Sequence, residues 1–387
     1  MNLKMQPRYP IRILEFRSVW GTGGGPEKTI LLGAARSNPE KYLITVCYIR
    51  DRRDKIFGPG SKAVGLPIEY LEVIEKNSFD LGLIPKLRKI VRDKNIDIVH
   101  AHDYKTNFFT ALLAKMEKII PLSTAHGYTG HTKREKFYYW ADKIILKRFP
   151  KIVTVSSQLR NELLRKGVSG NAVQVILNGI DPNAFKRDKS QCITAREKLN
   201  LPLEKIIIGS VGRLEPQKNY ELLLEVFAEF SENNKNVFLI IAGDGSLKAH
   251  LESRVNELNI AENCRLLGHQ SDISLIHHAL DIYIQSSNYE GTANSVLEAM
   301  AFETPLIATD VGGTSELIRD NIDGIIIPPR DRNALRYAID QVLKDEKASI
   351  HRASSARKQV ETELSFTTRM EKLESIYDAL ILSASRK

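Results

Sequence analysis

Short runs of aliphatic and β-branched residues alternate with segments of helical periodicity from one end of the chain to the other. The strand candidates run from residues 12–16 to 173–177 in the first half and from 206–211 to 324–327 in the second. Units of this kind fold into parallel sheets that are covered by helices. Since 387 residues are too many for one core, we expect two doubly wound α/β domains.

The segment 178–189 between the two series is rich in turn formers and charged residues, which predicts the interdomain linker. We therefore place the first domain at residues 1–186 and the second at 187–365. The last helix, within residues 366–387, has no strand left to cover, so we expect it to pack back on the first domain. Ligands of such domains bind at the carboxyl ends of the strands, which we expect to face a shared cleft.

The three cysteines are widely spaced and have no clustered histidines, so they predict neither a disulfide framework nor a structural zinc site. We therefore expect a cytoplasmic protein. We expect neither an export signal nor a membrane span, because no apolar stretch is long enough. The net charge of +9 is uneven, with +16 on residues 1–190 and −7 on residues 191–387. This asymmetry predicts an anionic partner for the first half, either nucleic acid or an acidic membrane, unless the basic face is merely solvated. No nucleic-acid-binding module accompanies the charge, so no nucleic acid is expected.

The segment 133–151 is both basic and aromatic. A helical spacing predicts a stripe that faces the core, made of Phe137, Trp140, Ala141, Ile144 and Ile145. The basic residues would then be available for anionic lipid or, alternatively, simply solvated; they are Arg134, Lys136, Lys143, Lys147 and Arg148.

A glycine-rich loop follows the first strand and opens a helix at Pro26. Gly24 and Gly25 would let the backbone approach a ligand, and the N–H groups at a helix start suit a phosphate. The loop lacks the third glycine of the dinucleotide fingerprint and the Lys-Ser/Thr pair of a P-loop, which disfavours a nicotinamide dehydrogenase and a P-loop NTPase. Taken alone, it could equally be a flexible turn.

Two cations, Arg213 and Lys218, lie on the loop after the strand 206–211. At this spacing an arginine fork and a lysine point charge can converge on one dianion, and a diphosphate fits. For an isolated pair, solvated surface charges would be the simpler interpretation.

The block 285–313 changes that interpretation, because it holds Glu290 and Glu298 with seven residues between them. Together with Arg213 and Lys218, this pattern resembles the family 4 glycosyltransferases, which are retaining enzymes of GT-B fold. Further matching motifs follow in order along nearly the whole chain: Gly24-Gly25-Pro26-Glu27, His100-Ala101-His102-Asp103, Thr124-Ala125-His126-Gly127, Gly243-Asp244-Gly245 and Leu267-Gly268-His269.

The resemblance implies a donor site in the second domain. Glu298 would accept the ribose hydroxyls, Glu290 would bind the donor sugar, and Arg213 and Lys218 would neutralise the departing diphosphate. Backbone groups are also implied: the N–H groups of Gly291, Thr292, Ala293 and Asn294 at a helix start near Thr292 would face the diphosphate, and the loops at Gly245 and Gly268 would hold the nucleobase.

His126 is implied to lie beside the transferred sugar, where it positions rather than attacks. His102 and Asp103 could be functional or could form a structural turn. One departure from the family pattern lies at Thr292-Ala293, where an aromatic residue and proline are frequent, and this could alter donor preference.

We therefore expect a retaining glycosyltransferase that moves a sugar from a UDP- or GDP-sugar to a saccharide acceptor. The acceptor would be lipid-linked, and the process would be surface polysaccharide biosynthesis. The protein would act at the inner face of the plasma membrane. No cofactor is expected to be required, and no metal ion is assigned because no Asp-x-Asp clamp is seen. Two alternatives stay open: a nucleotide-sugar epimerase, which would turn over donor without acceptor, and a non-catalytic nucleotide-sugar-binding protein, which would transfer nothing.

Overall fold

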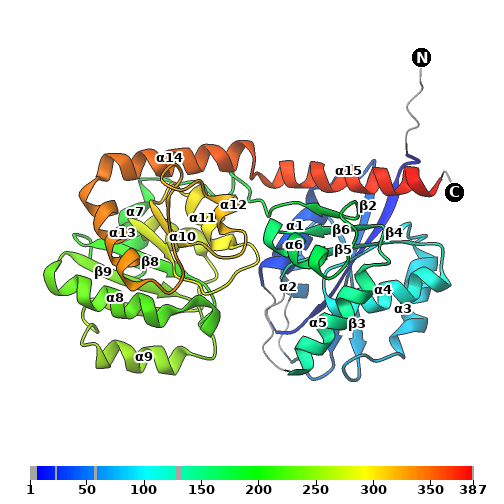
Figure 1. Ribbon diagram of the computed structural model, residues 1–387, viewed down its shortest axis with the longest axis horizontal. Helices are drawn as coiled ribbons and strands as arrows, with labels where there is room; N and C mark the ends of the chain where they lie inside the picture. Colours follow the sequence, from blue (N-terminus) through cyan, green and yellow to red (C-terminus); the bar gives the residue numbers. More distant parts are fainter. Residues whose placement is uncertain (1–6, 22–23, 56–58, 128–132, 386–387) are drawn as a thin grey trace, which may run out of the picture. The chain divides into compact units, whose positions relative to one another are not determined.

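The computed structural model describes residues 7–21, 24–55, 59–127 and 133–385 (Figure 1). The chain divides into two units, one made of residues 1–178 and 367–387 and the other of residues 179–366. The last helix therefore belongs to the first unit. The predicted boundary at residue 186 lies inside the second unit.

Two arginines explain why the linker belongs to the second unit. Arg357 donates to the carbonyls of Pro182 and Phe185, both at 2.7 Å. Arg187 donates to the carbonyl of Phe302 at 2.6 Å. Turn-forming composition locates the linker in the sequence, but these tertiary hydrogen bonds decide which unit holds it.

The first unit is built on a seven-stranded parallel sheet of order β3-β2-β1-β4-β5-β6-β7. Its strands are β1 (Ile11–Val19), β2 (Tyr42–Asp51), β3 (Glu69–Glu75), β4 (Ile98–Ala101), β5 (Ile120–Ala125), β6 (Lys151–Thr154) and β7 (Val173–Val175). Its helices are α1 (Gly25–Arg36), α2 (Pro59–Ala63), α3 (Leu83–Asp93), α4 (Tyr104–Met116), α5 (Lys133–Leu146), α6 (Ser157–Arg165) and α15 (Phe366–Ala384). Apolar residues of the central strands, Leu14, Phe16 and Val99, form a buried core with Phe109 of α4.

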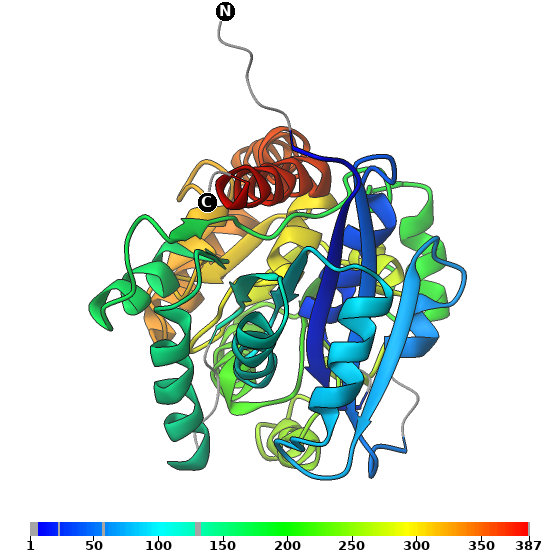
Figure 2. The same cartoon turned by 90° about the vertical axis from the view of Figure 1, so that its right-hand side faces the viewer.

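Helix α15 packs on the beginning of β1 and β2 (Figure 2). Asp378 accepts hydrogen bonds from the hydroxyls of Tyr9 at 3.0 Å and Tyr42 at 2.9 Å. One residue earlier, the hydroxyl of Tyr377 donates to Glu15 of β1 at 2.8 Å. These contacts attach the end of the chain to the sheet of the first unit.

The second unit has a six-stranded parallel sheet of order β10-β9-β8-β11-β12-β13. Its strands are β8 (Ile206–Val211), β9 (Val237–Ala242), β10 (Cys264–Gly268), β11 (Ile282–Gln285), β12 (Leu306–Thr309) and β13 (Ile325–Ile327). Its helices are α7 (Gln191–Lys198), α8 (Tyr220–Asn233), α9 (Lys248–Glu257), α10 (Ile273–Ala279), α11 (Asn294–Ala301), α12 (Thr314–Leu317), α13 (Arg332–Lys344) and α14 (Glu346–Thr362), with a 3₁₀ turn at Pro216–Lys218. Its core includes Phe227, Leu239, Ile241 and Ile284. The predicted pair of doubly wound α/β domains is confirmed.

The strand order reverses at one point in each sheet, between β1 and β4 in the first unit and between β8 and β11 in the second. Loops at the carboxyl ends of strands diverge at such a reversal, and open α/β sheets bind their ligands there. Each unit therefore has one preferred location for a ligand site.

The predicted core-facing stripe of α5 is wrong at three of its positions. Phe137, Trp140 and Ile144 are 59%, 57% and 39% exposed. The buried side of the helix instead carries Asp142 and Leu146, and Asp142 accepts a hydrogen bond from Asn107 of α4 at 2.8 Å. The helix thus buries a polar contact together with Leu146, on a different side from the one that hydrophobic spacing alone predicts.

No helix within the described residues has both the length and the apolar character needed to span a bilayer.

Candidate functional site

The loops that follow β8 and β11 are hydrogen-bonded to each other at the point where the second sheet reverses its order. The Oγ of Ser286 donates to the carbonyl of Lys218 at 2.9 Å, and the N–H of Asn288 donates to the carbonyl of Gln217 at 2.7 Å. The two loops that carry most of the predicted donor-site residues are therefore held as one structure.

Three of the predicted residues meet in one side-chain cluster. The Nζ of Lys218 lies 2.6 Å from Oε1 of Glu290, and these side chains are only 13% and 7% exposed. Gln217 donates to the other Glu290 oxygen at 3.1 Å and accepts a hydrogen bond from Arg213 at 3.1 Å. Ser287 also donates to Glu290, at 2.7 Å. Gln217 and Ser287 give no signal of their own in the sequence, yet their amide and hydroxyl hold the charged groups together.

Glu298 lies on α11 and is 9% exposed. One of its oxygens is 3.8 Å from Nε2 of the fully buried His277. Helix α11 begins at Asn294, after Ala293, rather than near Thr292 as predicted. The carboxylate of Glu298 is therefore one helical turn inside α11, and Thr292 belongs to the preceding loop.

The predicted glycines of the second unit lie at the ends of neighbouring strands. Gly291 accepts a hydrogen bond from the N–H of Gly313 at 2.9 Å, which joins the loops after β11 and β12. Gly268 accepts one from the N–H of Gly243 at 2.8 Å. A Cβ added at Gly245 would lie 2.6 Å from the carbonyl oxygen of Leu214, so this loop packs directly on the loop that carries Arg213.

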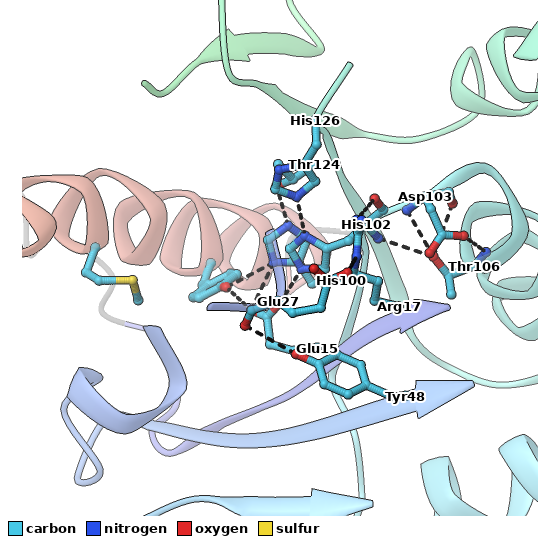
Figure 3. A network of polar contacts seen from close by, with 12 residues as sticks. Glu15, Arg17, Glu27, Tyr48, His100, His102, Asp103, Thr106, Thr124 and His126 are labelled. Atoms are coloured by element: carbon cyan, nitrogen blue, oxygen red, sulfur yellow. Dashed lines mark hydrogen bonds and ion pairs between the residues drawn. The ribbon is translucent and has the colours of Figure 1, made fainter. Parts of the chain in front are cut away.

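In the first unit the reversal point is occupied by a buried polar network (Figure 3). Glu15 of β1 pairs in register with His100 of β4. The carboxylate of Glu15 contacts Nδ1 of His100 at 3.1 Å, the hydroxyl of Tyr377 at 2.8 Å and Nε2 of His102. The alternation of β-strand side chains places His100 and His102 on the same face of the sheet as this carboxylate.

The predicted His126, just after β5, extends this network (Figure 3). Its Nε2 lies 3.0 Å from Nδ1 of His102, and the two rings meet edge to edge with centroids 5.3 Å apart and planes inclined by 28°. Its Nδ1 is buried and has no hydrogen-bond partner among the described residues. His126 is thus held by protein through one ring nitrogen, while the other is buried and unpaired among the described residues.

A second set of charges connects the glycine-rich loop to His102. Arg17 donates to the carbonyl of His102 at 2.8 Å and forms an ion pair with Glu27. Glu27 in turn accepts a hydrogen bond from the N–H of Gly24, the residue before the first turn of α1 at Gly25. The predicted Gly24 and Gly25 are therefore anchored at the reversal point, whereas residues 22 and 23 of the same loop lie outside the described residues.

Asp103 acts as the N-terminal cap of α4. Its carboxylate accepts hydrogen bonds from the N–H groups of Lys105 and Thr106, both at 2.9 Å, and from that of Ser18 at 2.7 Å. These bonds satisfy backbone donors at the helix start, which accounts for the residue structurally.

Burial controls the protonation of the histidines in the network. It lowers the pKa of His102 to about 4, with His100 acting in the same direction. Burial also lowers the pKa of His126 well below its ordinary value, and the charge of Arg17 adds to this effect. Burial opposes ionisation of Glu15, but His100 and His102 outweigh it and hold the pKa of this carboxyl well below its ordinary value. At neutral pH the network therefore contains an ionised Glu15 with neutral His102 and His126.

Glu15, His100 and His102 are also residue types that bind metal ions, and their ligand atoms lie within 4.8 Å of one another. Each of these atoms already takes part in a hydrogen bond: Nε2 of His100, for example, lies 2.7 Å from Oγ1 of Thr124. The geometry is that of a closed hydrogen-bond network.

The depressed pKa of His102 predicts acid destabilisation of the first unit. The unfolded chain binds this proton below pH ~6.5, whereas the folded protein resists it until about pH 4. The free energy of unfolding should therefore fall by up to ~1.4 kcal/mol per pH unit from this one group as the pH drops from 6.5 towards 4. Urea unfolding at several pH values measures the slope, with His102→Asn as the reference that lacks the titrating group. Equal slopes in the two proteins would contradict the assignment.

Two family models match the chain in the order of its units. Residues 35–184 match Glycosyltransferase Family 4, and residues 193–359 match Glycosyl transferases group 1. The chain is 25% identical over 314 residues to the UDP-Gal:alpha-D-GlcNAc-diphosphoundecaprenol alpha-1,3-galactosyltransferase of Escherichia coli, covering 79% of this chain and 81% of that protein. It is 27% identical over 344 residues to an uncharacterised glycosyltransferase of Methanocaldococcus jannaschii, covering 86% and 88%.

Among solved structures, Anabaena Alr3699/HepE in complex with UDP-glucose superimposes with a TM-score of 0.84 at 18% identity, covering 95% of this chain and all of that one. This likeness confirms the GT-B fold. The protein is accordingly a glycosyltransferase of GT-B fold, with a first unit of family 4 type and a second unit of group 1 type.

Proposed function

We propose that the protein transfers a sugar from a nucleoside-diphosphate sugar, with UDP or GDP as the nucleotide, to a saccharide acceptor with retention of anomeric configuration. The observation that carries the proposal is the cluster in which Arg213, Lys218 and Glu290 meet around Gln217. Two cations and a carboxylate at the carboxyl ends of β8 and β11 match the needs of a diphosphate and a sugar hydroxyl.

The chemistry follows from the charge that develops as the nucleoside diphosphate leaves. Lys218 and Arg213 stabilise that charge, and Glu298, one turn inside α11, accepts the ribose hydroxyls. His126 of the first unit binds a hydroxyl of the sugar. These cations supply the stabilisation that a metal ion gives in other transferases, so the proposal requires no metal and no other cofactor.

A donor panel tests the proposal. The protein is incubated with UDP-, GDP- and ADP-sugars and a membrane extract, with and without EDTA. We expect release of one nucleoside diphosphate together with labelled glycan, unaffected by EDTA. Conversion of the donor without acceptor would favour an epimerase, tight donor binding without transfer would favour a binding protein, and loss of transfer in EDTA would refute the metal-free reaction.

For the acceptor we propose a lipid-linked saccharide in surface polysaccharide biosynthesis. Support comes from the Escherichia coli relative, whose name specifies a diphosphoundecaprenol-linked sugar as its acceptor. The excess of positive charge in residues 1–190, +16 against −7 in the rest, agrees with an acceptor presented at an anionic surface.

The exposed face of α5 supports contact with such a surface, at the inner face of the plasma membrane. Phe137 and Trp140 are more than half exposed, and their ring centroids are 5.8 Å apart. Lys136 and Lys147 are exposed on the same helix and directly after it. Aromatic rings favour the headgroup region, and each basic residue near an anionic leaflet contributes about 1 kcal/mol.

Three of the predicted lipid-binding residues are not used in this argument; one of them, Arg148, is exposed directly after α5. Lys143 is only 13% exposed because its ammonium pairs with Glu162 of α6. The side chain of Arg134 lies outside the described residues.

We expect the protein to sediment with anionic vesicles at low salt and to be released at high salt. The Lys136→Gln/Lys147→Gln variant should bind such vesicles about thirtyfold more weakly, since two contributions of ~1 kcal/mol are lost. The matched control is Lys86→Gln/Lys89→Gln, which removes the same charge from exposed positions of α3. Equal losses in both variants, or equal binding to neutral vesicles, would refute membrane contact through α5.

A further inference from the structure

The hydrogen bonds around Glu15 determine where each proton of the network lies. The carboxylate is ionised and can only accept. The hydroxyl of Tyr377 donates to Oε1 at 2.8 Å, because burial keeps the pKa of this phenol well above its ordinary value. Nδ1 of His100 faces the same oxygen at 3.1 Å and therefore carries a proton; it also lies 3.1 Å from the Tyr377 hydroxyl, and Nε2 of His100 lies 2.7 Å from Oγ1 of Thr124.

The second oxygen of Glu15 determines the protonation of His102. Nε2 of His102 contacts this oxygen and must carry the proton that it donates. A neutral imidazole has only one N–H, so Nδ1 of His102 is an acceptor. The only described partner of that Nδ1 is Nε2 of His126, at 3.0 Å, which must therefore be the donor.

The same reasoning gives the protonation state of His126. Its single proton is on Nε2, where it is donated to His102. Its Nδ1 therefore carries a lone pair, and this is the buried atom that has no partner among the described residues. The hydrogen bonds that run from His126 through His102 to Glu15 thus leave one acceptor, Nδ1 of His126, without a donor among the described residues.

We propose that Glu15 is a positioning residue that acts through His102 to hold His126 in the Nε2–H tautomer, so that Nδ1 of His126 accepts a hydrogen bond from a hydroxyl of the bound sugar. This deepens the proposed function and depends on it for the identity of the ligand. It also specifies the ligand: a group that donates, such as a hydroxyl, fits at Nδ1, whereas a carboxylate or a fluorine would face the lone pair. Sugars that carry a hydroxyl at this point are therefore selected over uronates and fluoro analogues.

The tautomers can be measured without any sugar. In protein labelled with ¹⁵N-histidine, long-range ¹H–¹⁵N correlation distinguishes a protonated from an unprotonated ring nitrogen. Signals are assigned by comparison with His126→Gln and His102→Gln. We expect both rings to be neutral at pH 7, each with the proton on Nε2 alone.

Glu15→Gln should invert both tautomers. The amide oxygen remains opposite the two donors, Tyr377 and His100, so the amide NH₂ faces His102. His102 must then accept at Nε2 and donate from Nδ1, which moves the proton of His126 to Nδ1. The matched control is Tyr377→Phe, which removes one donor from Glu15 but leaves the contact with His102, and it should keep the wild-type tautomers.

For whichever donor in the panel the wild type consumes, Glu15→Gln should lower kcat tenfold to hundredfold, since a lone pair at His126 is replaced by an N–H. A wild-type spectrum with the proton of His126 on Nδ1, or a Glu15→Gln protein that folds and keeps the wild-type tautomers, would overturn the proposal. One equivalent of tightly bound metal in the purified protein would overturn it as well. The spectra need no sugar donor, so the tautomer proposal can be tested even if the proposed function fails. If Glu15→Gln does not fold, the wild-type spectrum alone tests the tautomer proposal.

Discussion

Lys218→Met should lower kcat for sugar transfer about 10²- to 10³-fold. The ammonium of Lys218 lies beside Glu290 and is mostly buried, so water cannot replace its charge when the diphosphate departs. Loss of one preorganised donor to a developing negative charge costs this much in other enzymes, about 3–4 kcal/mol of barrier. Release of nucleoside diphosphate under donor saturation measures the effect.

A second variant separates this effect from damage to the fold. Lys218→Met leaves Glu290 with Gln217 and Ser287 as its side-chain donors among the described residues, which should lower the melting temperature. Ser287→Ala is the control, because it also removes one side-chain donor from Glu290 but leaves both cations in place. An equal loss of turnover in Ser287→Ala at an equal loss of melting temperature would show that Lys218 supports only the fold.

Gly243→Ala should lower the free energy of unfolding of the second unit by at least about 3 kcal/mol. Gly243 has φ +155°, and a Cβ at this position would lie 1.8 Å from the carbonyl oxygen of Gly212. Both the backbone and its neighbour would have to move, and the neighbour is the start of the Arg213 loop. Urea unfolding measures the loss, and donor binding should weaken with it.

Gly268→Ala is the matched control for this prediction. Gly268 also has a positive φ, of +68°, but a Cβ there would meet nothing within 4 Å. Only the strain of the left-handed conformation remains, which costs about 1 kcal/mol. Similar losses in the two variants would mean that close packing on the Arg213 loop is not what constrains Gly243.

The cluster of Arg213, Lys218 and Glu290 was largely predictable because its members follow strands in short, ordered motifs. Arg213, Lys218 and Glu290 were singled out from their spacing and resemblance, and the structure brings them together. Gln217 lies inside the same motif but was missed, since an uncharged amide between two cations gives no signal of its own. Its role depends on the distance between two loops that are about seventy residues apart in sequence.

The network of the first unit was predicted only in part. His126 and His102 were named, but their contact depends on the pairing of β4 with β5, which no local pattern specifies. Glu15 left one signal, as the acid within a strand candidate that otherwise carries Ile13, Leu14, Phe16 and one arginine. A charged group at the centre of a buried sheet must have partners, and that requirement could have identified it.

Helix α5 shows where hydrophobic spacing misleads. The five apolar residues with helical spacing predicted a buried face, yet three of them are exposed. The pattern correctly predicts an amphipathic helix. It does not show whether the apolar side is buried in the protein or exposed on its surface. The buried side instead carries Leu146 and the hydrogen bond between Asn107 and Asp142, which joins two helices that sequence alone does not pair.

The anomeric configuration of the first-formed product tests the central claim most directly. With UDP-glucose or another α-linked donor that the panel identifies, the anomeric ¹H coupling of the new linkage is read by NMR before any equilibration. Retaining transfer from the Arg213, Lys218 and Glu290 cluster predicts an α-linked product. A β-linked product would contradict it.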